Sequence, residues 1–309
     1  MRIAVITTSY PAFDGDPSGH FVEAEVRELE RVGHRVTVHT PPPGGAFGWP
    51  GAPARIREKP TRLLEAGSWL GATSRGLARE RVDRVIAHWS VPAAYPVVVG
   101  PFGRDACPDA ELEVVSHGGD VRLLGALPDG LRSRIVRAVA ARATRWRFVS
   151  DELRAALGAV LSAEDERALA RVSVIVPGAL DVPDVSDVRA DATRKRAAVG
   201  DRRLYVCAGR LVRDKRIDKV IDYVATCTHL RERKGRVLVI LGDGPERAHL
   251  ERQAQAWQMD ARFLGTTPRR EALGWIGAAD ELVHASRAEG LSTVVREAAI
   301  LGTPVTRLA

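Results

Sequence analysis

Short apolar runs alternate with amphipathic segments along the whole of this 309-residue chain. The apolar runs are rich in β-branched residues, which is typical of strands covered on both faces. Between the first two runs, Val22, Val26 and Leu29 recur at helical spacing, and Gly33 provides a stop signal. A strand, a helix and a second strand in this order predict a βαβ unit and therefore a parallel sheet.

The same alternation predicts the domain organisation. The apolar runs predict strands at residues 2–8, 34–40, 84–90, 112–119, 146–151 and 172–178, and then at 204–209, 237–242, 262–265, 281–286 and 303–308. The clearest helices among them are predicted at 131–143 and 151–161. Residues 41–60 read as a Pro- and Gly-rich loop, and residues 177–188 as a linker. We therefore predict two open parallel α/β domains, residues 1–180 and 187–309, with ligands bound at the carboxyl ends of the strands.

Composition narrows the classes of protein that fit this pattern. Hydrophobic residues make up 45% and charged residues 28%, the mix of a globular protein. The net charge is +7, but the arginines are spread along the chain and aromatic residues are only 5%, which argues against a nucleic-acid binder. The three cysteines have no metal-like spacing, Cys207 lies in an apolar run, and no run approaches the ~20 residues of a membrane span. A cytoplasmic protein without a disulfide scaffold is expected.

A basic turn follows the first predicted strand of the second domain. Gly209 allows a tight turn, Arg210 comes directly after it, and Lys215 lies near the start of the next helix. Two cations close to a helix N-terminus would suit a diphosphate, although charge alone equally fits a solvated turn. The next strand ends in Gly-Asp-Gly, a weak turn signal, with Pro245 expected at the first helical position.

Two acids in "AEGLSTVVREAAILGTPV" suggest a different ligand group. Glu289 lies in a predicted turn, and Glu297 lies inside a helix that Ser292 can cap and Gly302 can end. Acids beside a phosphate site would repel phosphates, whereas carboxylates accept hydrogen bonds from sugar hydroxyls. Solvated acids near a helix start are the alternative interpretation.

The first domain offers further candidates at its strand ends. "SHGGDV" places His117 beside two glycines, where its imidazole could hydrogen-bond a ligand oxygen or remain an ordinary loop histidine. Gly19 and His20 begin the first helix and could meet an anion or act as a simple cap. His88 and Trp89 end another strand and could line an acceptor pocket or only pack.

Taken together, these segments resemble the retaining glycosyltransferases of family 4. The resemblance covers nearly the whole chain and includes "AHWSVP", "HGGDV", "VIVPGALDV", "GRLVRDKRIDKVID", "LGDGPE", "FLG" and "EGLSTVVREA". The last segment matches the family's pattern of two glutamates eight residues apart. The resemblance implies the GT-B architecture of two Rossmann-like domains facing a cleft, with an acceptor-side N-terminal domain and a nucleotide-sugar-binding C-terminal domain.

The resemblance also implies roles for individual residues. Arg210 and Lys215 would hold the donor diphosphate, Glu297 the ribose hydroxyls, and Glu289 the transferred sugar, which His117 would also contact. The remaining residues implied at the donor are Gly19, Gly209, Gly290, Leu291 and Ser292. Those implied on the acceptor side are His20, His88, Trp89 and Asp120. No metal and no cofactor is implied, because the cations stabilise the leaving diphosphate and the nucleotide sugar is itself the donor substrate.

Some features depart from the family pattern. Only Gly19 stands where family members usually carry two glycines, and Pro177 replaces an asparagine. The family continues beyond "GTPV", so we expect a truncated second domain and weakened or absent activity. The predicted function is sugar transfer to a glycan, lipid-linked or small-molecule acceptor, with peripheral contact at the inner membrane face as an option. A nucleotide-sugar-binding protein without turnover and a nucleotide-sugar epimerase are the alternatives.

Overall fold

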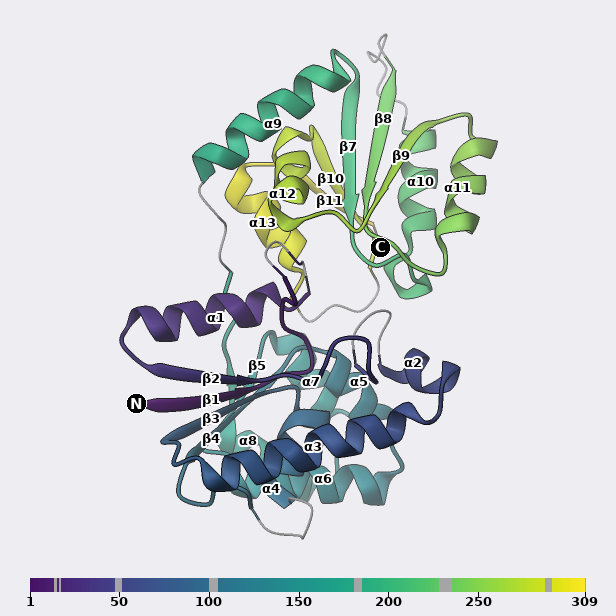
Figure 1. Ribbon diagram of the computed structural model, residues 1–309. Helices are drawn as coiled ribbons and strands as arrows, with labels where there is room; N and C mark the ends of the chain where they lie inside the picture. The colour runs from purple at the N-terminus through teal and green to yellow at the C-terminus, as the bar shows by residue number, and fades with distance from the viewer. Residues whose placement is uncertain are drawn as a thin grey trace. The chain divides into compact units, whose positions relative to one another are not determined.

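The computed structural model describes residues 1–13, 16, 18–47, 52–99, 105–180, 185–227, 235–286 and 291–308. Contacts divide the chain into two compact units. Unit 1 comprises Met1–Ala12 and Ser18–Ala179, and unit 2 comprises Phe13–Pro17 and Leu180–Ala309. Each unit is built on one parallel sheet covered by helices (Figure 1), as the alternating pattern predicts.

Unit 1 contains a sheet in the order β2-β1-β3-β4-β5-β6. Its strands are β1 Arg2–Ile6, β2 Arg35–His39, β3 Arg84–His88, β4 Glu111–Ser116, β5 Arg145–Phe148 and β6 Ser173–Ile175. Its helices are α1 His20–Arg31, α2 Ala52–Glu58, α3 Arg62–Arg79, α4 Tyr95–Val99, α5 Gly119–Ala126, α6 Asp129–Arg142, α7 Asp151–Gly158 and α8 Ala163–Val172, with a π-helical turn at Ser90–Ala94. Helix α1 lies on one face of the sheet, and α3, α4 and α6 lie on the other (Figure 1).

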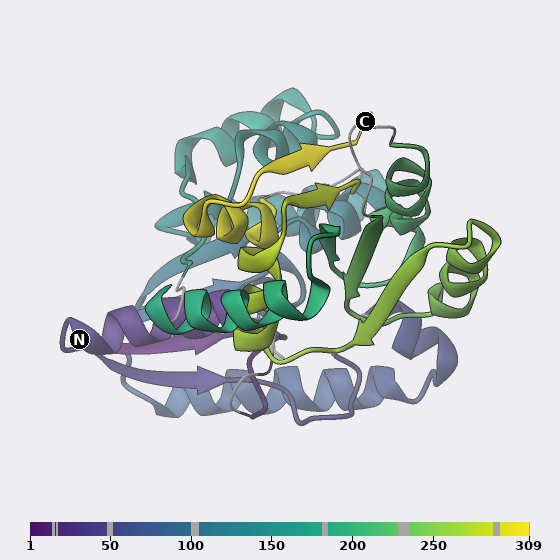
Figure 2. The same ribbon diagram turned by 90° about the horizontal axis from the view of Figure 1, so that it is seen from above.

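Unit 2 contains a sheet in the order β11-β10-β7-β8-β9. Its strands are β7 Arg203–Ala208, β8 Arg236–Leu241, β9 Asp260–Gly265, β10 Glu281–His284 and β11 Val305–Arg307. Its helices are α9 Val185–Val199, α10 Ile217–Thr226, α11 Arg247–Ala256, α12 Arg269–Ala278 and α13 Thr293–Leu301, with a 3₁₀ turn at Arg213–Lys215. In Figures 1 and 2, α10 and α11 cover one face of this sheet and α9, α12 and α13 cover the other.

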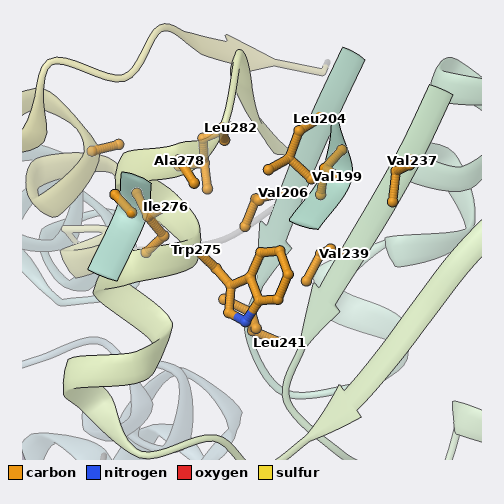
Figure 3. Packing of buried hydrophobic residues seen from close by; sticks show 13 residues of the cluster. Val199, Leu204, Val206, Val237, Val239, Leu241, Trp275, Ile276, Ala278 and Leu282 are labelled. Carbon is orange, nitrogen blue, oxygen red and sulfur yellow. The ribbon is translucent and has the colours of Figure 1, made fainter. Parts of the chain in front are cut away.

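The core of unit 2 follows directly from the two-residue period of its strands. Leu204 and Val206 of β7 point to the face covered by α9 and α12, where Trp275 packs against them (Figure 3). Tyr205 and Cys207 alternate with them and pack under α10 and α11. Cys207 is 2% exposed, which confirms its prediction as a small buried apolar residue. Because both faces are buried, the strands read as continuous apolar runs.

Every predicted strand run overlaps an observed strand, whereas some boundaries and loops differ. The Pro- and Gly-rich stretch 41–60 was expected to lack regular structure, but "APARIRE" forms α2. Helix α9 begins at Val185, inside the stretch predicted as a linker. Pro245 precedes the Glu246 N-cap of α11 and is not the first helical residue. In the part of the chain that the structure describes, no helix is both long and apolar enough to span a bilayer.

Candidate functional site

The described donor residues of unit 2 follow two neighbouring strands of its sheet. Strands β7 and β10 are neighbours, but the chain leaves β7 toward β8 and leaves β10 toward β11 on the opposite side. This is a topological switch point, the kind of position at which open parallel α/β sheets bind ligands. Arg210 follows β7, and Ser292 and Glu297 follow β10. The predicted diphosphate residue Arg210 therefore lies directly after β7, and the predicted ribose residue Glu297 lies in α13, the helix that follows the adjacent strand β10.

Gly242, directly after β8, brings the β8 loop into direct backbone contact with the loop after β7. Its φ is +126°, and a Cβ built on it would lie 2.0 Å from the carbonyl oxygen of Gly209. The Gly209 amide in turn donates to the carbonyl of Leu241 at 2.9 Å. The Gly-Asp-Gly turn, which the sequence presents only as a weak signal, thus packs directly against the loop that carries Arg210 and fixes its course.

Arg210 and Lys215 lie near the two ends of the short segment that joins β7 to α10. Arg210 is exposed, and Lys215 is half-buried at the end of the 3₁₀ turn, two residues before α10 begins. The Leu211 amide donates to the carbonyl of Asp243 at 2.9 Å, which ties this segment to the β8 loop. The segment therefore presents two cations from a backbone that the neighbouring loop holds in place.

Glu297 has a partner that the sequence does not reveal. It lies inside α13 at 7% exposure, and its Oε1 accepts a hydrogen bond of 2.8 Å from Nη2 of Arg269. Arg269 is the first residue of α12, and its side chain is itself mostly buried. A buried carboxylate is costly unless it is paired, so the hydrogen bond from Arg269 satisfies one oxygen of Glu297 and fixes its orientation.

The predicted ends of the helix after β10 are confirmed in position, but the predicted capping hydrogen bond is not formed. Helix α13 begins at Thr293 with Ser292 as its N-cap residue, and Gly302 ends it with φ +77°. The Ser292 side chain makes no capping hydrogen bond, so only its position matches the prediction. Leu291 and Ser292 are half-buried in front of this helix. Glu289 and Gly290 lie outside the described residues.

In unit 1, two histidines from adjacent strands form a direct pair. His88 ends β3 and is fully buried, whereas His117 follows β4 and is partly exposed. Nδ1 of His88 lies 2.9 Å from Nε2 of His117, and the two rings are stacked with centroids 5.2 Å apart. The sequence brings both residues to strand ends, but their pairing follows from β3 and β4 being neighbours in the sheet.

Aromatic rings enclose the His117 imidazole. Its centroid lies 4.7 Å from that of Phe21, on α1, and 5.0 Å from that of Trp89. Trp89 adopts φ +72°, a left-handed conformation that is costly for a bulky residue and that often marks functional sites. These contacts hold the imidazole in one orientation.

Asp120 is buried beneath this loop. It is 1% exposed, and its Oδ2 accepts hydrogen bonds from the amide and hydroxyl of Ser90 and from the hydroxyl of Ser116. Its Oδ1 accepts from the amides of His117 and Gly118 at 3.2 Å each. The prediction that Asp120 faces the acceptor is therefore corrected, because its oxygens brace the His117 loop from inside.

Gly19 and His20 begin α1 where the sequence predicts. Gly19 is the N-cap residue with φ +67°, and a Cβ there would lie 2.2 Å from the carbonyl oxygen of Ser9. Only glycine fits this close approach of the loop after β1 to the helix start. His20 is half-buried beside Phe21, with ring centroids 5.7 Å apart. A capping and packing role explains both residues without a ligand, as the alternative interpretation states.

Both paired histidines are neutral at neutral pH. Burial lowers the pKa of His88 to about 3, with a further contribution from the positive charge of Arg147. Burial likewise lowers the pKa of His117 to about 3, and the neighbouring His88 adds to this. Each imidazole therefore carries one proton, and the hydrogen bond between them has one donor and one acceptor.

These lowered pKa values make a prediction about acid stability. Between pH 6.5 and about 3 the two histidines bind protons in the unfolded chain but not in the folded protein. The free energy of unfolding should therefore decrease as the pH decreases. The expected slope is up to about 1.4 kcal/mol per pH unit for each imidazole. Urea unfolding of the wild type and His88→Gln across this range measures it. The variant should show the shallower slope, and equal slopes would contradict the burial of a neutral pair.

The sequence did not reveal three residues that neighbour the site residues. Phe21 packs against His117, Glu25 lies 3.9 Å from His88, and Arg269 pairs with Glu297. Phe21 and Glu25 lie four residues apart on α1, so a helical reading places them on one face toward the sheet. Helical spacing could therefore have found this pair. For Arg269 no such signal exists, because its partner is 28 residues away on another helix. Among the described residues, no group of three His, Cys, Asp or Glu side chains is arranged to hold a metal ion.

Comparison with known proteins adds a family and two relatives. Residues 188–306 match the family described as Glycosyl transferases group 1. The chain is 25% identical over 342 aligned positions to a Bacillus subtilis protein named as a teichuronic acid biosynthesis glycosyltransferase, TuaC, covering 99% of this chain and 80% of TuaC. It is 29% identical to a GDP-mannose-dependent alpha-(1-6)-phosphatidylinositol monomannoside mannosyltransferase of Mycolicibacterium smegmatis, covering 97% and 78%.

Solved structures agree on the fold. Sucrose-phosphate synthase from Thermosynechococcus elongatus superimposes with a TM-score of 0.72 at 19% identity, covering 99% of this chain and 80% of that one. HepE from Anabaena, in complex with UDP-glucose, superimposes with a TM-score of 0.65 at 17% identity and the same coverage. These similarities, together with the two parallel sheets, confirm the predicted GT-B fold of two Rossmann-like units.

Proposed function

We propose that this chain, whose residues 188–306 match the family Glycosyl transferases group 1, moves a sugar from a nucleoside-diphosphate sugar to an acceptor hydroxyl, with retention of configuration and without a metal. The observation that carries the proposal is the switch point of unit 2. There Arg210 and Lys215 follow β7 while Glu297 follows the adjacent β10. The relative that depends on GDP-mannose and the neighbour that holds UDP-glucose are consistent with such a donor.

We assign the diphosphate to Arg210 and Lys215. In glycosyl transfer, negative charge grows on the departing diphosphate as its bond to the sugar breaks. The two cations stand on a segment braced by the Leu211–Asp243 hydrogen bond, so little reorganisation is needed when that charge appears. This supply of positive charge from the chain itself is what supports a reaction without a metal.

We assign the nucleoside ribose to Glu297. Its carboxylate is oriented by Arg269, and a carboxylate accepts hydrogen bonds from a pair of neighbouring hydroxyls. Retention of configuration rests on the resemblance to family 4, whose two-glutamate pattern the chain carries at Glu289 and Glu297. Glu289 and His117 are assigned to the transferred sugar on the same grounds, with Gly290, Leu291 and Ser292 beside the phosphates and Trp89 on the acceptor side.

The experiment that tests this function follows the product directly. The protein is incubated in EDTA with UDP-, GDP- or ADP-linked sugars and a simple glycoside acceptor, and proton NMR reports the anomeric configuration. A new glycoside with the donor's configuration is expected. An inverted product would contradict retention, and turnover that appears only after a divalent cation is added would contradict metal independence. Binding without turnover would identify a nucleotide-sugar-binding protein, and an epimerised donor would identify an epimerase.

A second prediction concerns the buried pair in unit 2. Arg269→Met should weaken nucleoside-diphosphate binding about 10- to 100-fold, because a charged hydrogen bond that orients Glu297 is lost. Glu297→Gln should cost a similar factor, and the double variant should be little worse than either alone, since both changes break one interaction. Calorimetric titration measures the affinities. Arg270→Met is the matched control, because Arg270 is exposed and pairs with Asp187. Additive losses in the double variant would show that Arg269 does not act through Glu297.

A further inference from the structure

A chain of buried charges lies behind the histidine pair of unit 1. Glu25 of α1 forms an ion pair with Arg147 of β5, which also pairs with Glu113 of β4. The side chains of Glu25, Arg147 and Glu113 are all largely buried. Glu25 presents its second oxygen, Oε2, to Nε2 of His88 at 3.9 Å. Glu25, His88 and His117 therefore lie in a row that begins at a buried carboxylate and ends at a partly exposed imidazole.

The Glu25 carboxylate makes no hydrogen bond to Nε2 of His88, but its negative charge favours one proton arrangement in the histidine pair. The two neutral rings can share their hydrogen bond in two ways. If His88 donated from Nδ1, its lone pair at Nε2 would face the carboxylate of Glu25, which is unfavourable. If His88 instead keeps its proton on Nε2, that N–H faces the carboxylate and Nδ1 becomes the acceptor. His117 then donates from Nε2, and its own Nδ1 carries no proton.

We propose that Glu25, acting through His88, holds His117 in the tautomer with an unprotonated Nδ1, so that His117 accepts a hydrogen bond from a ligand hydroxyl. Glu25 and His88 are thus positioning residues, and His117 is the group that meets the ligand. The last step rests on the proposed function, in which the ligand is a sugar. The sequence alone suggested that His117 hydrogen-bonds a ligand oxygen, and the pair now specifies the direction: the hydroxyl donates.

The consequence is selectivity for a hydrogen-bond donor. A ligand hydroxyl can donate to a bare imidazole nitrogen, whereas a fluorine in its place cannot. One deoxyfluoro position on the sugar that His117 contacts should therefore lower kcat/KM about 10- to 100-fold in the wild type, and this penalty should shrink in a variant whose His117 carries its proton on Nδ1.

The tautomers can be measured without any activity assay. Long-range proton–nitrogen correlation spectra of ¹⁵N-histidine-labelled protein distinguish protonated from unprotonated ring nitrogens, and His88→Gln and His117→Gln assign the signals. The wild type should show protons on Nε2 of both rings. Glu25→Gln, whose amide can donate to Nε2 of His88, should move the proton of His117 to Nδ1. Glu25→Asp keeps the charge and should retain the wild-type pattern.

Glu113→Gln is the matched control. It removes another buried carboxylate from Arg147 but does not contact His88, so it should cost stability and leave both tautomers unchanged. A proton on Nδ1 of His117 in the wild type, or an identical spectrum in Glu25→Gln, would overturn the proposal. If the tautomers behave as expected while no nucleotide sugar is turned over, the proposed function fails and the tautomer assignment stands.

Discussion

Replacing Lys215 with Met is expected to lower kcat for sugar transfer by about 10²- to 10³-fold, the usual loss when one preorganised group that stabilises a developing anion is removed. Arg210→Met should give a loss of the same order. Both side chains leave the segment between β7 and α10, so each removes positive charge where the diphosphate is proposed to depart. Release of the nucleoside diphosphate, followed by a coupled assay, measures the rates.

Lys219→Met provides the control for these charge changes. Lys219 lies on α10 of the same unit, is half exposed and pairs only loosely with Asp222, at 3.8 Å. Its replacement removes the same charge and should change kcat less than twofold. If Lys215→Met retained more than a tenth of the wild-type kcat, or if Lys219→Met matched its loss, the assignment of the leaving-group cation would be wrong.

Gly242→Ala is expected to destabilise unit 2 by about 3 kcal/mol or more and to weaken nucleoside-diphosphate binding. The new Cβ would lie 2.0 Å from the Gly209 carbonyl oxygen, and φ is +126°. The cost combines an unfavourable backbone conformation with overpacking against a backbone that cannot rotate away. Because the displaced residue precedes Arg210, the affinity should fall along with stability. Urea unfolding and calorimetric titration measure the two effects.

Gly200→Ala separates backbone strain from the clash. Gly200 has φ +70°, but a Cβ on it would meet no atom within 4 Å. Its replacement should cost only about 1–2 kcal/mol and leave nucleotide affinity unchanged. Equal losses of affinity in the two alanine variants would show that Gly242 does not support the Arg210 loop.

The fold was predictable from the sequence because both sheets are parallel and covered on both faces. Such strands are continuous apolar runs, so all of them could be found, from Arg2–Ile6 to Val305–Arg307. The helix at Ala52–Glu58 was missed because Pro and Gly residues around it signal a loop. Local signals also misplaced Pro245, which lies just outside α11.

The sequence predicted which segments carry the candidate site residues, but not which residues those side chains contact. Arg210 and His117 could be placed at strand ends, and Glu297 in the helix after a strand, because parallel strands share one ligand-binding edge. Their partners could not be found this way. Glu25 meets Arg147 across 122 positions in the sequence, and a single sequence has no local pattern that records such a contact. The Asp120 error has the same origin in part, since two of its five donors belong to Ser90, 30 positions away in the sequence.

Calorimetric titration of GDP, UDP and ADP in EDTA tests the central claim most directly, that the segment after β7 binds the diphosphate of a nucleotide through Arg210 and Lys215. At least one of the three should bind to the wild type without any divalent cation, and its monophosphate should bind more weakly. The R210M/K215M double variant should lose this preference for the diphosphate. A diphosphate that binds the double variant as tightly as the wild type, or that binds only after a divalent cation is added, would contradict the account.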